Sequence, residues 1–144
     1  MKVYDNLKDK NIIFKVCKTF YEKVYDHPWL ALYFKDIDQD HITNQQTAFI
    51  IGAIGGPKNF SGRLPVNAHP HMLITDELFD VRLDILKEAM VEEGTPQELV
   101  DVWLKLDEAF RRAIVKNTVQ ELKGRYATDT FLNFDKPYSY KKTG

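Results

Sequence analysis

Apolar residues recur at steps of three and four positions along most of the chain, which is the spacing of one face of an α-helix. The predicted helices cover residues 11–26, 41–54 and 75–93, and a last one that begins near residue 95. His27-Pro28 and Gly55-Gly56-Pro57 mark two of their ends, because proline and glycine stop helices. No segment alternates apolar and polar residues for long, so the predicted fold class is all-α.

The last predicted helix begins with a capping pattern. Thr95 is the expected N-cap, Pro96 stands at the first helical position, and Glu98 completes a capping box. The buried face of this helix is expected to hold Leu99, Val102, Trp103, Leu106, Phe110, Ala113 and Ile114. Between the helices, the sequence predicts a turn-rich piece over residues 29–40 and a loop over residues 58–68.

Length and charge exclude several classes of protein. The 144 residues suit a single domain, with a core over about residues 11–123 and a tail over residues 124–144. Twenty basic and 21 acidic residues leave a net charge of -1, so we expect neither nucleic-acid binding nor attachment to an acidic membrane. No apolar run approaches the roughly 18 residues of a membrane span. The single cysteine, Cys17, forms no internal disulfide, which favours a cytoplasmic location.

Two polar residues interrupt apolar helix faces. Gln46 lies on the expected inward face of the second helix, and Tyr21 lies one residue away from the apolar face of the first. A buried polar group costs about 1–3 kcal/mol unless it finds a hydrogen-bond partner. Each could find that partner in the backbone or in solvent, or could serve a bound ligand. The inward face of the second helix is expected to be Ile42, Gln46, Phe49, Ile50 and Ala53.

The four histidines do not form a zinc-binding pattern. His27, His41, His69 and His71 lack the spacing of known zinc motifs. One histidine beside an apolar slot is nevertheless enough to serve as an axial ligand of haem iron. Cys17 lies on a core face and is interpreted as a packing residue.

Taken in order, these residues resemble the truncated haemoglobins, in which a two-over-two helical sandwich holds haem. The resemblance runs from about Ile13 to Ile114, most of the chain. It is carried by Phe20-Tyr21, Phe34, Gln46, Gly55-Gly56-Pro57, Phe60-Ser61-Gly62-Arg63, Ala68-His69, Ile74-Thr75 and Phe79.

The resemblance implies a cofactor and a set of site residues. It implies non-covalent haem b with His69 as the iron ligand, and it leaves His71 outside the ligand position. It matches Tyr21 and Gln46 to the pair that hydrogen-bonds the ligand on the opposite, distal side of the haem. The pocket walls implied by the resemblance are Phe34, Ile42 and Phe79.

Two arginines complete the implied site. Arg63 and Arg82 are candidates to pair with the haem propionates. Arg82 stands where the family pattern has an apolar residue or a tryptophan, so it either reaches outward to a propionate or brings a positive charge to the distal side. The missing tryptophan favours the first subgroup of the family. No histidine follows His71, so a covalent haem link is not expected.

Three functions are compatible with this sequence. The first is reversible dioxygen binding at ferrous iron, for storage, delivery or sensing, in a pocket that could also take nitric oxide or carbon monoxide. The second is an enzyme that oxidises nitric oxide to nitrate with electrons from a separate reductase. The third is a helical interaction module without a cofactor, which Gln46 on an apolar face disfavours.

Overall fold

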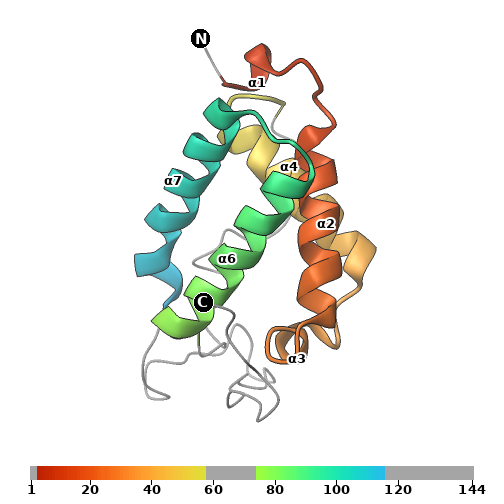
Figure 1. Cartoon of the computed structure of the whole chain (residues 1–144), viewed down its shortest axis with the longest axis vertical. Coiled ribbons are helices and arrows are strands. Elements are labelled where there is room, and N and C mark those ends of the chain that lie inside the picture. Colours follow the sequence, from red (N-terminus) through yellow and green to blue (C-terminus); the bar gives the residue numbers. More distant parts are fainter. Residues whose placement is uncertain (1–2, 58–73, 116–144) are drawn as a thin grey trace.

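The chain is described by a computed structural model over residues 3–57 and 74–115, apart from the side chains of residues 112–114. Within these ranges every regular element is a helix, as the sequence predicted. The helices are α1 (Val3–Asn6), α2 (Ile12–Asp26), α3 (Ala31–Phe34), α4 (Gln39–Ala53), α6 (Asp76–Glu92) and α7 (Gln97–Ile114) (Figure 1).

The four long helices form two pairs that pack on each other. Helix α2 packs against α4 and also against α6, and α7 lies alongside α6 (Figure 1). The pair α2 and α4 therefore covers the pair α6 and α7 through the contact of α2 with α6. This is the two-over-two arrangement that the resemblance implied.

Helix α2 lies at the centre of the core because its apolar residues fall on one continuous face. Ile13, Val16, Cys17 and Val24 are almost completely shielded from solvent. The neighbouring helices add Ile50 from α4, Leu86, Ala89 and Met90 from α6, and Leu99 and Trp103 from α7. The core thus joins all four long helices and fixes the direction in which the remaining side chains of α2 point.

The helix ends agree with the sequence in one case and correct it in another. Thr75 caps α6 as its side-chain oxygen accepts a hydrogen bond from the Leu78 amide at 3.2 Å. The predicted capping box at α7 is wrong, because the N-cap is Pro96 and Thr95 makes no capping bond there. The Thr95 hydroxyl instead donates to the Met90 carbonyl of α6 at 2.8 Å.

The glycine pair after α4 has a steric role. Gly55 has a φ of 103°, a backbone conformation that residues with a side chain rarely adopt. A Cβ atom on Gly56 would lie 2.6 Å from Cγ2 of Ile51 and 2.9 Å from Cδ1 of Tyr4. The pair therefore ends α4 and leaves room for α1, a single turn that the helical periodicity did not predict.

The inward face of α4 differs from the predicted one at its edges. Ile50 is buried, and Ile42, Gln46 and Phe49 are half-buried. Ala53 is exposed, against the prediction, and Thr43 is buried instead. The helix tolerates this hydroxyl because it donates to the Gln39 carbonyl one turn earlier, at 2.8 Å.

Candidate functional site

The Tyr21 side chain of α2 lies in an aromatic environment. It is 5% exposed, and its ring meets Phe20 edge-on at 4.9 Å and Phe34 at 6.0 Å between centroids. Burial raises the pKa of the hydroxyl, which therefore stays protonated and able to donate. Among the described residues it has no hydrogen-bond partner. The structure thus brings Tyr21 and Phe34 together, as the predicted site requires.

Gln46 comes from α4, the helix that packs against α2. Its side chain is half-buried, one turn after Ile42 and one turn before the buried Ile50. No residue in the described ranges hydrogen-bonds its side-chain amide. Two adjacent helices therefore each carry a polar side chain, buried for Tyr21 and half-buried for Gln46, that forms no hydrogen bond within the described residues.

Arg82 of α6 forms an ion pair that the sequence did not indicate. Its Nη1 atom donates to Oδ2 of Asp107 on α7 at 2.7 Å, and Asp107 is only 3% exposed. The guanidinium lies 5.2 Å from the centroid of the Phe20 ring and 5.7 Å from that of Phe79. Arg82 thus has a partner within the protein, whereas the sequence suggested a propionate or a charge on the distal side.

Asp107 could have been recognised from the sequence. It lies four residues after Trp103, which is itself four residues after Leu99, so all three share one face of α7. A carboxylate at such a position needs a cation, because an isolated buried charge is very costly. The same reasoning that singled out Gln46 applies to Asp107.

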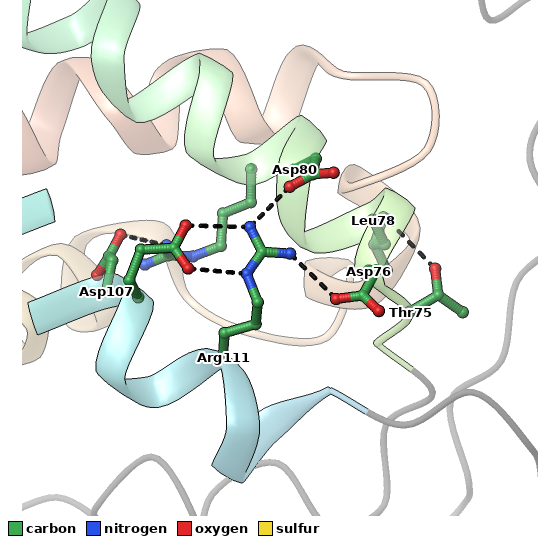
Figure 2. A network of polar contacts seen from close by, with 8 residues as sticks. Thr75, Asp76, Leu78, Asp80, Asp107 and Arg111 are labelled. Atoms are coloured by element: carbon green, nitrogen blue, oxygen red, sulfur yellow. Dashed lines mark hydrogen bonds and ion pairs between the residues drawn. The ribbon is translucent and has the colours of Figure 1, made fainter. Parts of the chain in front are cut away.

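A second arginine ties α6 and α7 together. Figure 2 shows Arg111 of α7 reaching two carboxylates of α6, Asp80 at 2.7 Å and Asp76 at 3.1 Å. Its Nε atom donates to Glu108 at 3.0 Å, and its guanidinium lies 4.5 Å from the Phe79 ring centroid. Both arginines therefore contact Phe79, the predicted pocket-wall residue, which is 2% exposed.

Several other candidates are excluded within the described ranges. Burial raises the pKa of the Cys17 thiol to about 12, so it is no nucleophile at neutral pH and packs as predicted. No group of three or more His, Cys, Asp or Glu residues there could hold a metal ion. None of the helices in these ranges has the length and apolar character that crossing a membrane requires.

The remaining predicted residues have different outcomes. His27 is structural, since its Nδ1 atom accepts from the Trp29 and Leu30 amides at 3.1 Å. Three other predicted residues, namely His69, His71 and Arg63, lie outside the described residues.

Comparison with known proteins places this geometry in a family. The family model for bacterial-like globins matches residues 2–120. A Group 1 truncated hemoglobin from Tetrahymena pyriformis is 29% identical over 110 residues, which cover 76% of this chain and 91% of that protein. A Group 1 truncated hemoglobin from Synechocystis sp. is 26% identical over 102 residues, which cover 68% of this chain and 82% of that protein.

Solved structures agree with the sequence relatives. The truncated hemoglobin from Tetrahymena pyriformis in its Fe(III) form superposes with a TM-score of 0.72 at 27% identity, over 81% of this chain and 100% of that one. The Group II truncated hemoglobin from Bacillus anthracis gives a TM-score of 0.70 at 22% identity, over 85% and 98% of the two chains. The second likeness concerns the fold alone.

Proposed function

This chain belongs to the bacterial-like globin family, whose members hold haem, and we propose that it binds dioxygen reversibly in a pocket formed at the contact of α2 and α4. The Tyr21 hydroxyl is the observation that carries this proposal. It is shielded, protonated and without a partner among the described residues. A buried donor left unpaired costs about 1–3 kcal/mol, and a ligand that accepts a hydrogen bond from the Tyr21 hydroxyl would offset such a cost.

The residues of this chain fit a non-covalently held haem b. Haem iron held by a single histidine keeps one coordination position for a small ligand such as dioxygen. We assign the histidine role to His69, by resemblance to the family, and the pocket walls to Phe34, Ile42 and Phe79. Of these walls, Phe34 already contacts Tyr21, and Phe79 is fully within the core.

Tyr21 and Gln46 would orient and retain the ligand. The tyrosine offers one O–H donor, and the amide of Gln46 offers two N–H donors and an acceptor. They come from α2 and α4, which pack directly on each other, so both can approach one small molecule from adjacent helices. Phe20 and Phe34 exclude water from the Tyr21 side, which strengthens each of these hydrogen bonds.

Arg63 is the better candidate for a haem propionate. Arg82 is already paired with Asp107 at 2.7 Å, which weakens the case for its pairing with a propionate. An arginine at the rim of the pocket can bind a carboxylate in bidentate fashion.

The free and deeply buried thiol of Cys17 suits a reducing compartment, so we also propose a cytoplasmic location.

Nitric oxide dioxygenation is the second candidate function, favoured by the same shielded tyrosine donor. In that reaction nitric oxide, dioxygen and one electron give nitrate, and the electron comes from a separate reductase. Tyr21 and Gln46 would hold the dioxygen while nitric oxide enters. Mixing the oxygenated protein with nitric oxide in a stopped-flow instrument should give nitrate within one mixing time if this candidate is right.

Reversible oxygenation tests the first function. The haem-loaded protein is reduced, exposed to dioxygen and then freed of it under argon while its visible spectrum is recorded. We expect the spectrum to change on oxygenation and to return on removal of the gas. Immediate conversion to the ferric form would contradict reversible binding.

A further inference from the structure

The Arg82–Asp107 ion pair lies beside Phe20, the residue before Tyr21 on α2. The Arg82 guanidinium is 5.2 Å from the Phe20 ring centroid, and the Phe20 ring is 4.9 Å from the Tyr21 ring. Helix α6, which carries Arg82, packs along α2, which carries both aromatic residues. A positive charge therefore approaches the buried face of α2 close to the proposed ligand pocket.

The positive end of the ion pair faces α2, because the Arg82 guanidinium lies 5.2 Å from the Phe20 ring centroid of α2 whereas Asp107 comes from α7. The positive charge of Arg82 lowers the pKa of Tyr21 more strongly than the negative charge of Asp107 raises it, although burial has the largest effect and raises that pKa. For the Cys17 thiol, one turn before Tyr21, the charge of Arg82 likewise lowers the pKa more than the charge of Asp107 raises it. Asp107 thus keeps the guanidinium in place without cancelling its field at Tyr21.

The arginine has hydrogen-bonding capacity beyond Asp107. A guanidinium carries five N–H donors, and one Nη1 bond is made to Asp107. Its side chain is 27% exposed, whereas the Asp107 side chain is 4% exposed, so the cation is the less enclosed partner. A partly buried positive charge of this kind attracts anions more strongly than a fully hydrated one would.

We propose that Arg82 is a further determinant of ligand binding, which makes the Tyr21 side of the pocket positive and favours small inorganic anions over neutral ligands of the ferric haem. This inference rests on the proposed haem function and adds a second class of ligand to it. Asp107 is a positioning residue, because it holds the Arg82 side chain in place, and its own charge only partly opposes that of Arg82.

The test compares one anionic and one neutral ligand of the ferric protein. The haem-loaded full chain is titrated with azide and, separately, with imidazole at neutral pH and constant ionic strength, and binding is followed by the shift of the Soret band. Arg82→Met should weaken azide binding about tenfold, the effect of about 1.4 kcal/mol. Imidazole binding should change by less than about threefold, because a neutral ligand gains little from the charge.

Arg111→Met is the matched control. It removes the same charge from the neighbouring helix, but the Arg111 guanidinium contacts the Phe79 ring and is held by half-exposed carboxylates. Azide affinity should stay within about twofold of the wild-type value in this variant, because the three carboxylates of Asp76, Asp80 and Glu108 already offset the Arg111 charge. An equal loss in both arginine variants would show a general charge effect and overturn the proposal.

Further variants separate charge from packing. Arg82→Lys keeps the charge and should retain most of the azide affinity, whereas Asp107→Asn removes the opposing charge and should raise it. Because Arg82→Met leaves Asp107 buried without its cation, the double variant Arg82→Met/Asp107→Leu removes both charges together. It should still lose azide affinity while remaining folded, although by less than Arg82→Met alone, because the opposing charge of Asp107 is removed as well.

The outcomes separate this inference from the proposed function. Equal losses for azide and imidazole, or an unchanged azide affinity in the double variant, would overturn the role of Arg82 and leave haem binding intact. Failure of the wild-type chain to develop a Soret band would refute the proposed function and this inference together.

Discussion

Replacing Tyr21 with phenylalanine removes a single oxygen atom from the proposed pocket. The ring is 5% exposed and is held by Phe20 and Phe34, so the phenylalanine should occupy the same position. The hydroxyl has no partner among the described residues, so its loss should cost the ligand-free fold little. The effect of Tyr21→Phe should therefore fall on the ligand.

The magnitude follows from the hydrogen bond that is lost. Ferrous haem would supply electron density to a dioxygen held in the pocket, so the Tyr21 hydroxyl would donate to a partly charged acceptor. Hydrogen bonds to charged groups contribute roughly 1.5–3 kcal/mol, and the shielding of Tyr21 argues against a smaller value. At about 1.4 kcal/mol per factor of ten, dioxygen release should accelerate by about one to two orders of magnitude.

Stopped-flow dissociation of dioxygen and of carbon monoxide measures this effect. Carbon monoxide carries less charge on its oxygen, so its release should change much less. Gln46→Leu should act in the same direction, and the double variant should be less than additive because both groups serve one acceptor. Tyr25→Phe is the matched control, since the Tyr25 hydroxyl already donates to the Ile37 carbonyl at 2.8 Å. This variant should leave both dissociation rates unchanged. Equal acceleration of both gases in Tyr21→Phe would refute the hydrogen-bonding role and indicate altered access.

Two further predictions concern the helix that carries Arg82 and the rim of the pocket. Thr75→Ala removes the N-cap of α6 and should lower the free energy of unfolding by about 1 kcal/mol in a urea titration, whereas Thr75→Ser should retain most of it. Arg63→Ala should speed haem transfer to an acceptor globin by up to about fivefold, since exposed ion pairs contribute about 0–1 kcal/mol, and an unchanged rate would remove Arg63 from the site.

The helical architecture could be predicted because it depends on local spacing. The apolar face of α2 and the proline and glycine after α2 and α4 define those helices without knowledge of the fold. Position 95 shows where local rules fail. The Thr95 hydroxyl had the sequence context of an N-cap, but the tight connection after α6 places it at the Met90 carbonyl. Which acceptor the Thr95 hydroxyl binds therefore depends on the tertiary structure.

The candidate site could be predicted only in part, for a related reason. Tyr21 and Gln46 stood out as polar residues among apolar ones, and the structure buries Tyr21, whose position in the sequence had left both a buried and a surface location open. Asp107 could be recognised as a carboxylate on a buried helix face, but its pairing with Arg82 could not be predicted, because this ion pair between α6 and α7 joins residues that are 25 positions apart. Its recognition required both Asp107 on the buried face of α7 and the packing of that helix on α6.

Titration of the purified chain with haemin tests the central claim, haem binding through His69, most directly. The wild-type chain should develop a Soret band that saturates at one haem per chain. His71→Ala should behave in the same way, and His69→Ala should lose the band or show a markedly altered one. Loss of the band in His71→Ala with retention in His69→Ala would contradict the assignment of the iron ligand, and no band in the wild-type chain would contradict haem binding itself.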